Sequence, residues 1–232
     1  MSVIQFTSVN YPESDGKPMG ETDVHIKQTM RLRHLLERFF AGQRVYVSGN
    51  LLVFYEQGNP KKFFVPDVFV VKGIKPGDRR FYKLWVERRP PSVVIEVTSR
   101  KTKKQDTVVK PELYRRLGVP EYFLFDPTQE YLDPPLQGFR LLGEHYAALA
   151  SAGESWMESE QLGLRLCLEG KDLVLYRVDT GERLLTAEEA LRAEAKARRA
   201  EAKARRAEAE ARRAAEAEVA RLREELRRRG AT

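Results

Sequence analysis

A seven-residue repeat near the C-terminus restricts the fold of this chain more than any other sequence feature. Residues 192–198 read Arg-Ala-Glu-Ala-Lys-Ala-Arg, residues 199–205 repeat this string, and residues 206–212 repeat it with glutamate in place of lysine. These residue types favour helices strongly, and neither glycine nor proline occurs between Thr186 and Gly230. We therefore predict one long helix that begins after Thr186, a typical N-cap residue, and ends near Gly230.

A line of alanines follows one side of this predicted helix. The alanines are spaced alternately four and three residues apart. After extra four-residue steps, the line continues with larger apolar residues. Its members are Ala193, Ala197, Ala200, Ala204, Ala207, Ala211, Ala215, Val219, Leu222 and Leu226. Alanine buries little surface in a coiled coil, whereas valine and leucine offer larger knobs. The pattern is compatible with two alternatives, a solvated single helix and a coiled coil that makes the protein a homo-oligomer.

The net charge of +7 on 232 residues suggests a nucleic-acid partner. Residues 186–232, however, contain 14 Lys and Arg against 10 Asp and Glu, so +4 of this charge belongs to the mixed-sign helix and only +3 to the remainder. Composition alone therefore gives modest support for DNA binding, and the local chemistry has to supply the argument.

Composition also excludes several classes of protein. With 42% hydrophobic residues the chain can bury a core, and its single cysteine, Cys167, excludes a disulfide scaffold and a cysteine-based zinc site. No stretch approaches the roughly 20 apolar residues of a membrane span. Residues 1–6 lack the layout of a signal peptide. We expect a soluble cytoplasmic protein without a membrane partner.

The chain divides by composition into three segments: an arm rich in Ser, Pro, Gly and Asp (residues 1–20), a globular domain (residues 21–185) and the helical tail (residues 186–232). The globular segment opens with apolar residues at helical spacing over Asp23–Phe40, namely Ile26, Met30, Leu32, Leu35, Leu36, Phe39 and Phe40. We predict an amphipathic helix there, which ends at Gly42.

The rest of the globular segment alternates between extended and helical patterns. We predict a hairpin (Val45–Val47 and Leu51–Tyr55), two strands (Phe63–Val71 and Ser92–Val97), a short helix (Pro111–Leu117), a strand (Tyr122–Phe125) and extended pieces near Phe139–Leu142, Leu164–Leu168, Leu173–Tyr176 and Arg183–Leu185. This order predicts a mixed α/β fold.

Three carboxylates interrupt the strands of this predicted core. Asp67 lies within Val-Pro-Asp-Val-Phe-Val-Val, Glu96 lies within Val-Val-Ile-Glu-Val, and Asp126 ends Phe-Leu-Phe-Asp. A carboxylate in an apolar strand costs several kcal/mol unless it is paired or binds a metal. Asp126, next to Pro127, is explained best as a turn residue. If their strands are neighbours, Asp67 and Glu96 can share a hard divalent cation, which prefers oxygen ligands.

A lysine on the following helix completes the candidate site. Lys110 lies four residues after Asp106 and could hold an attacking water or neutralise charge on a phosphate. The alternative is an ordinary surface lysine paired with Asp106 or Glu112. The spacing alone leaves both interpretations open.

These strings together resemble the Uma-two family, part of the PD-(D/E)XK nuclease-like superfamily. The resemblance covers about residues 22–185 and rests on Val65-Pro66-Asp67-Val68, Val94-Ile95-Glu96-Val97-Thr98-Ser99, Asp106, Lys110, Tyr114, Gly118-Val119-Pro120-Glu121-Tyr122 and Asp126-Pro127. It implies a restriction-endonuclease-like fold, in which a four-stranded mixed sheet is flanked by helices in αβββαβ order. An Ala/Glu/Arg-rich helical tail is a frequent addition in this family.

The resemblance also implies Mg²⁺-dependent endonuclease activity on DNA, with Mn²⁺ as a substitute ion. Carried onto this chain, Asp67 and Glu96 correspond to the metal-binding carboxylates. The superfamily commonly has lysine two residues after the glutamate, but Thr98 occupies that position here, so Lys110 would take its role and Asp106 would orient it or hold metal-bound water. Glu37 could be an auxiliary ligand, although a solvated position on the first helix explains it better.

Other polar residues give weaker signals. His25, His34 and His145 are scattered and show no metal-ligand spacing, while Arg100, Lys101, Lys103 and Lys104 could contact phosphates or form a solvated loop. The alternative to a nuclease is a non-catalytic nucleic-acid or protein interaction module whose C-terminal helix mediates association.

Overall fold

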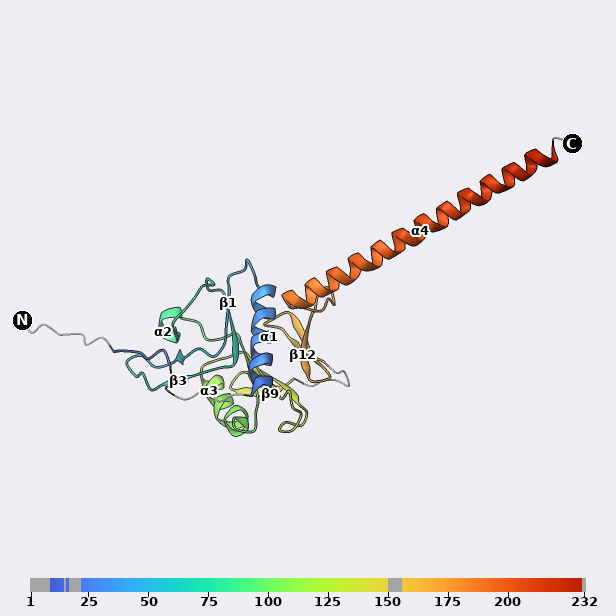
Figure 1. The fold of residues 1–232 in the computed structure, drawn as a ribbon. Helices are drawn as coiled ribbons and strands as arrows, with labels where there is room; N and C mark the ends of the chain where they lie inside the picture. Colours follow the sequence, from blue (N-terminus) through green and yellow to red (C-terminus); the bar gives the residue numbers. More distant parts are fainter. Residues whose placement is uncertain (1–8, 15, 17–21, 150–155, 231–232) are drawn as a thin grey trace, which may run out of the picture. The chain divides into compact units, whose positions relative to one another are not determined.

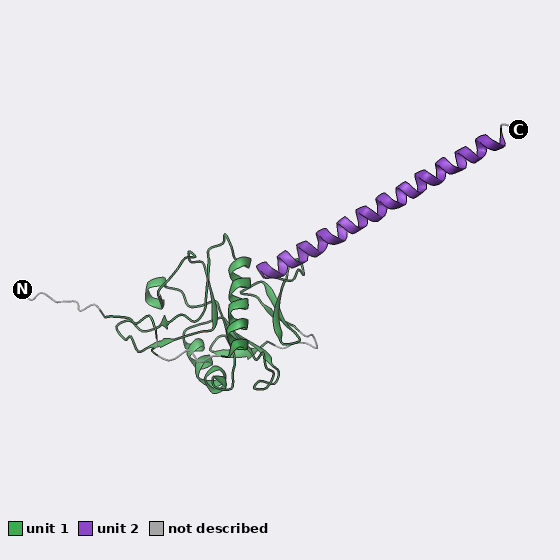
Figure 2. Ribbon diagram, viewed as in Figure 1, with its two compact units in different colours: residues 1–184 green, residues 185–232 purple. Residues whose placement is uncertain are grey.

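The architecture was analysed in a computed structural model, which describes residues 9–14, 16, 22–149 and 156–230 (Figure 1). The predicted arm at residues 1–20 lies largely outside the described residues. The chain forms two compact units, residues 1–184 and residues 185–232, which Figure 2 colours separately. No helix in the described ranges is long and apolar enough to cross a membrane.

A six-stranded mixed sheet forms the centre of the first unit. Its strands lie in the order β1 (Val45–Ser48), β4 (Val68–Lys72), β6 (Val93–Val97), β7 (Glu121–Phe125), β8 (Leu136–Leu142) and β9 (His145–Ala148). Only β6 and β7 pair in parallel; the other neighbours are antiparallel. With α1 (Asp23–Phe39) and α3 (Lys110–Arg116), the elements α1-β1-β4-β6-α3-β7 have the predicted αβββαβ order.

The mixed α/β fold is therefore confirmed, but the expected sheet of four strands is too small. After β7 the chain turns back and adds β8 along the free edge, with Phe125 opposite Leu136, and β9 then pairs with β8. A separate three-stranded sheet contains β10 (Trp156–Ser159), β11 (Leu164–Glu169) and β12 (Asp172–Arg177). The extended piece predicted at Arg183–Leu185 forms only an isolated bridge between Arg183 and Tyr176.

Two apolar layers cover opposite faces of the central sheet. On β6, Val93, Ile95 and Val97 join the layer that contains α1 and the β10–β12 sheet, whereas Val94 joins the layer that contains Tyr114 of α3. This alternation is the two-residue period of a strand, and it directs the side chain of Glu96 to the α3 side. All five residues of β6 are buried, as expected for a strand covered on both faces.

The predicted hairpin of Val45–Val47 and Leu51–Tyr55 is wrong. β1 pairs with β4, whereas β2 (Val53–Phe54) pairs with β3 (Phe63–Phe64) and β5 (Tyr82–Lys83) in a second small sheet. Gly49 lets the chain leave the central sheet, because a Cβ there would lie 2.1 Å from the carbonyl oxygen of Asp67. The predicted strand Phe63–Val71 is consequently divided between β3 and β4.

Helix α1 forms as predicted, but part of its buried face is polar. Leu32, Leu35 and Leu36 pack in the core, while the predicted core residues Ile26 and Met30 are 41% and 53% exposed. The positions one turn before Leu32 are instead filled by buried Gln28 and Thr29, and buried His25 lies two turns before it. The first turns of α1 therefore bring polar groups to the end of the central sheet.

The second unit is the single long helix α4 (Ala187–Arg229), as the repeat predicts. A capping box begins it: the Thr186 hydroxyl accepts the Glu189 amide hydrogen, and the Glu189 carboxylate accepts the Thr186 amide hydrogen. The helix ends at Gly230, and none of its residues is buried. The first unit also contains the short helix α2 (Leu84–Glu87).

Candidate functional site

Asp67 and Glu96 lie opposite each other where β4 begins and β6 ends. The antiparallel register pairs Val68 with Ile95, so the next pair outward is Asp67 and Glu96. Opposite residues of an antiparallel pair point to the same side of a sheet. The Asp67 amide accordingly donates to Glu96 Oε2 at 3.3 Å, and the Val97 amide donates to Asp67 Oδ2 at 2.7 Å. The two predicted carboxylates do converge.

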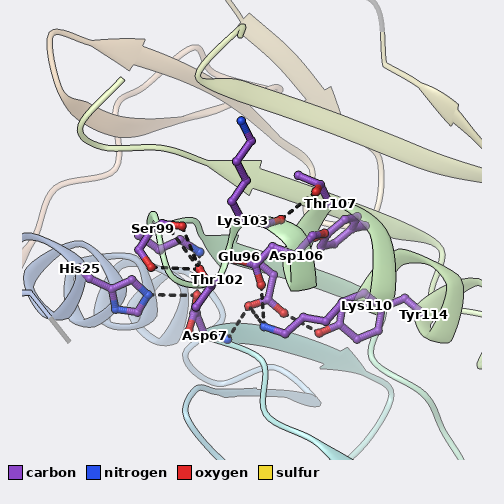
Figure 3. Close-up of polar contacts among 12 residues, drawn as sticks. His25, Asp67, Glu96, Ser99, Thr102, Lys103, Asp106, Thr107, Lys110 and Tyr114 are labelled. Carbon is purple, nitrogen blue, oxygen red and sulfur yellow. Dashed lines mark hydrogen bonds and ion pairs between the residues drawn. The ribbon is translucent and has the colours of Figure 1, made fainter. Parts of the chain in front are cut away.

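His25 from α1 holds Asp67 from the other side. Its Nε2 lies 3.3 Å from Asp67 Oδ2, and the two side chains are only 6% and 13% exposed (Figure 3). An ionised carboxylate only accepts hydrogen bonds, so Nε2 must carry the proton in this contact. Asp67 Oδ1 accepts no hydrogen bond from the described part of the chain. One oxygen of Asp67 is therefore anchored, and the other is available.

Glu96 is fully buried and is held by three donors. Oε2 accepts from Lys110 Nζ at 2.8 Å as well as from the Asp67 amide, and Oε1 accepts from the Tyr114 hydroxyl at 2.5 Å. Figure 3 shows Lys110 and Tyr114 converging on this carboxylate from the helical segment above the sheet. These contacts fix the orientation of Glu96 and partly offset the cost of burying it.

The helix that carries Lys110 is irregular at the site. A π-helical stretch, Gln105–Val109, leads directly into α3, and the Lys110 amide donates to the carbonyl of Gln105. Pro111 follows and has no amide hydrogen to continue the α-helical pattern. The predicted short helix thus has an earlier start, and its π-helical part includes Asp106. Such single-turn distortions occur often at functional sites.

Asp106 forms the second contact of Lys110. Its Oδ1 lies 2.9 Å from Lys110 Nζ, as an ion pair rather than a well-directed hydrogen bond, and its side chain is 1% exposed. The Tyr122 hydroxyl donates to the Asp106 main-chain carbonyl. One ammonium group therefore bridges two buried carboxylates, Glu96 and Asp106.

Burial and charge act in opposite directions on these groups. Burial raises the pKa of Asp67, but the hydrogen bond from His25, the charge of Lys110 and the Val97 amide together bring it below its usual value. For Glu96, burial raises the pKa to about 8; Lys110 opposes this shift, and the neighbouring carboxylates Asp67 and Asp106 add to it. The pKa of Asp106 is also raised, by burial above all.

For Lys110, burial and the neighbouring charges shift the pKa in the opposite directions. Burial lowers the pKa of Lys110, but Glu96, Asp106 and Asp67 outweigh it, so that the pKa is raised and the ammonium stays charged. The pKa of Tyr114 is well above its usual value because of burial and the nearby Glu96, which keeps its hydroxyl a donor. Three carboxyl groups thus lie around one permanent cation, and the raised pKa values of Glu96 and Asp106 limit the negative charge that they carry together.

The donor set suits a hard divalent cation. Asp67 and Glu96 supply carboxylate oxygens on one side of the sheet end, and Asp67 Oδ1 has no hydrogen-bond donor among the described residues. In the described ranges, no group of three or more His, Cys, Asp or Glu side chains is arranged to hold a metal ion. Water or phosphate oxygens would have to complete the coordination, as they commonly do for Mg²⁺.

Several candidates lie outside this cluster. Asp126 is a turn residue as predicted: its carboxylate accepts amide hydrogens from residues 128–132, and these bonds outweigh burial and lower its pKa. Glu37 is exposed and pairs with Arg33 at 2.8 Å. Residues 100, 101, 103 and 104 are exposed in the loop and helix start beside the site, and Figure 3 shows Lys103 pointing away from the carboxylates.

His25 is a part of the site that the sequence pattern did not indicate. The three histidines are scattered along the chain and show no metal-ligand spacing, but the fold brings His25 into contact with Asp67. A signal does exist: His25 lies seven residues before Leu32, on the buried face of α1. Thr98 is buried, and its hydroxyl has no partner in the described part of the chain.

Comparisons with known proteins identify a family and a similar structure. A family model named Uma2, described as "Putative restriction endonuclease", matches residues 7–169. A crystal structure described as a "putative nuclease belonging to DUF820" from Anabaena variabilis ATCC 29413 is similar, with 12% sequence identity and a TM-score of 0.45 over 66% of this chain and 86% of that chain. No curated protein matches the sequence.

Proposed function

Because the chain belongs to the Uma2 family, we propose that it is a nuclease that hydrolyses phosphodiester bonds of DNA with the help of Mg²⁺ or Mn²⁺. One observation carries the proposal: Asp67, Glu96 and Lys110, from three different elements, meet at one end of the central sheet. Burying these carboxylates costs free energy, so their convergence with a buried lysine favours a functional role for the cluster.

Asp67 and Glu96 would hold the metal ion. Asp67 has one oxygen anchored by His25 and Val97 and one oxygen available, while Glu96 is kept in place by Tyr114. The bound ion would supply an activated water and would stabilise the negative charge that develops on the phosphate. The two residues are pre-oriented by their neighbours, which reduces the cost of assembling the site.

Lys110 would act on the phosphate and the nucleophile. Its ammonium lies 2.8 Å from Glu96 and 2.9 Å from Asp106. With Glu96 engaged in holding a metal ion, Lys110 would donate to a phosphate oxygen or to the attacking water. Asp106 would keep the lysine at the site through their ion pair. The basic residues 100–104 on the adjoining loop would contact neighbouring phosphates.

The proposal is tested with substitutions that preserve side-chain shape. Asp67→Asn, Glu96→Gln and Lys110→Met should each lower Mg²⁺- or Mn²⁺-dependent cleavage of mixed DNA substrates by about 100-fold or more. The control is Glu112→Gln, which changes a carboxylate of the same helix that pairs only with Arg115 on the surface. Circular dichroism confirms the fold of each variant, and full activity in all three would exclude the assignment.

Calorimetry separates the nuclease from the non-catalytic interaction module. A nuclease of this type should bind Mn²⁺ in the wild-type chain and bind it weakly or not at all after Asp67→Asn. An interaction module needs no such ion. If the chain bound Mn²⁺ but cleaved no DNA substrate, the result would support the metal site and contradict the proposed reaction.

A further inference from the structure

Helix α4 carries an apolar line that nothing within the described part of its own chain covers. Val219, Leu222 and Leu226 are 48%, 47% and 70% exposed, and they extend the line of alanines along the same side of the helix. Large apolar residues at spacings of three and four are the knobs of a coiled-coil seam. In α4 these residues contribute nothing to the core of a single chain.

Charged residues flank this line with a definite order. In the first half, Lys196 and Lys203 come directly before seam alanines, and Glu194, Glu201 and Glu208 come directly after them; Glu210, before Ala211 at the extra four-residue step, departs from this order. In the second half the signs are reversed, since Glu218 precedes Val219 and Arg223 follows Leu222. These are the g and e positions of a coiled coil, whose charges select partner and orientation.

Several of these charges have no ion pair within their own helix. The i,i+3 and i,i+4 pairs of α4 include Glu194–Arg198, Glu201–Arg205, Arg212–Glu216 and Glu218–Arg221. Lys196, Lys203, Glu208 and Arg223 form no ion pair with any described residue. These four side chains are therefore available to pair with charges of another helix.

We propose that α4 binds α4 of a second copy of this chain as a parallel two-stranded coiled coil. In a parallel pair each g residue faces the e residue five positions further along the partner helix. All three such pairs have opposite charges: Lys196 with Glu201, Lys203 with Glu208, and Glu218 with Arg223. Two-fold symmetry forms each pair twice.

The apolar line favours the same orientation. Parallel pairing places Val219, Leu222 and Leu226 against their own copies, which concentrates the larger side chains in one apolar contact. Antiparallel pairing would place them against the alanine half, where the facing side chains are small, and would not form the three pairs named above. From Ala193 to Leu226 the line makes nine steps over 33 residues. This average is close to the natural period of an α-helix, so the two helices wind around each other only weakly.

Parallel pairing has a consequence for substrate cleavage, and this consequence rests on the proposed nuclease function. Both helices begin directly after the first unit, so two first units attach to the same end of the coiled coil. Two candidate sites are thereby supplied to one substrate, one for each strand of a DNA duplex. The coiled coil itself does not require nuclease activity.

Sedimentation equilibrium of the full chain tests the pairing by charge exchange. The wild type should have twice the chain mass, while Lys203→Glu and Glu208→Lys should each raise the dimer dissociation constant about tenfold or more, because each replaces two attractive contacts by two repulsive ones. An equal mixture of the two variants should restore a dimer with one copy of each. Arg206→Glu is the matched control: it changes the charge as Lys203→Glu does but lies outside the seam.

Each outcome decides the matter. If the wild type were a monomer at all accessible concentrations, or if Lys203→Glu left the dimer unaffected, the proposed pairing along the apolar line would be wrong. A dimer weakened by Lys203→Glu but unaffected by Glu208→Lys would overturn the parallel orientation. The measurement is independent of the proposed function, since Asp67→Asn should leave the mass unchanged, and Glu208→Lys should leave Mn²⁺ affinity unchanged.

Discussion

Glu96 is the residue at which the chemistry of the candidate site can be measured without a substrate. It is fully buried, and burial, opposed by Lys110 and assisted by the carboxylates of Asp67 and Asp106, raises its pKa to about 8. In the unfolded chain its pKa is near 4.5. Between these values the folded protein keeps a proton that the unfolded chain has lost. The free energy of unfolding must therefore fall as pH rises through this window.

We expect this loss to be on the order of 1–3 kcal/mol between pH 5 and 8 in EDTA. Glu96→Gln cannot titrate, so its stability should change less with pH than that of the wild type, as measured by urea denaturation. The lowered pKa of Asp67 acts below this window, and the raised pKa of Lys110 acts above it. If the free energy of unfolding changed with pH in the same way for the wild type and Glu96→Gln, Glu96 would be ionised over the whole range and the prediction would be wrong.

His25 supports Asp67 and should control how well the site binds metal. His25→Ala removes the contact to Asp67 Oδ2 and should weaken Mn²⁺ binding about tenfold, as losses of groups that orient metal ligands commonly do. His25→Gln retains a donor and should recover part of the affinity. His34→Ala, on an exposed part of the same helix, is the control for calorimetry. Equal affinities for His25→Ala and His34→Ala would refute the supporting role.

At the residue scale, the sequence was informative where a residue type contradicted its surroundings. The convergence of Asp67 and Glu96 could be predicted because carboxylates interrupt apolar strands. Lys110 was a candidate from its position four residues after Asp106, and the family resemblance then implied its role. His25 could not be found in the same way, because a histidine on a helix is chemically unremarkable until the fold brings Asp67 to within 3.3 Å of it. Contacts between distant elements have no local sequence signal.

At the scale of elements, the turn after β1 links the fold to the site. The main chain at Gly49 passes so close to Asp67 that an added Cβ would lie 2.1 Å from the Asp67 carbonyl oxygen, and the Asn50 amide donates to the Pro66 carbonyl at 2.9 Å. This contact replaces the predicted hairpin. Glycine at position 49 is therefore required for packing and for the position of Asp67.

Gly49→Ala should consequently affect both stability and metal binding. The backbone must move to relieve the contact, at a cost of about 1–3 kcal/mol in the free energy of unfolding. Mn²⁺ affinity should fall as Asp67 shifts, even at temperatures where the variant is fully folded. Gly230→Ala, whose added Cβ would meet its nearest neighbour at 3.4 Å, is the control. An unchanged melting temperature and Mn²⁺ affinity would contradict the proposed link.

The elements themselves could be predicted where a period was sustained. Helix α1, strands β6 and β7 and the 43-residue helix α4 match the sequence expectation closely, because each shows one clear hydrophobic or compositional pattern. The two-residue strands β2 and β5 and the four-residue helix α2 are too short for a period to appear. Pairing of β2 with distant β5 is decided by packing, so the nearby turn signal was misleading.

At the scale of the whole molecule, the chain consists of two compact units that are stabilised by different interactions. The first unit contains both apolar layers and every residue of the candidate site, whereas α4 buries none of its side chains and is stabilised by its capping box and its surface ion pairs. Folding of the first unit should not depend on α4, because no core residue is lost when α4 is removed.

A chain that ends at Leu185 tests this division. It should keep its cooperative unfolding and bind Mn²⁺ within about twofold of the wild type, since all groups that hold Asp67 and Glu96 remain. It should also be monomeric. If the proposed nuclease needs two sites for a duplex, the shortened chain should nick supercoiled DNA but produce fewer double-strand breaks. The full-length variant Lys203→Glu should show the same change, because it weakens the pairing without removing the helix. Loss of Mn²⁺ binding in a folded shortened chain would mean that the two units are not independent.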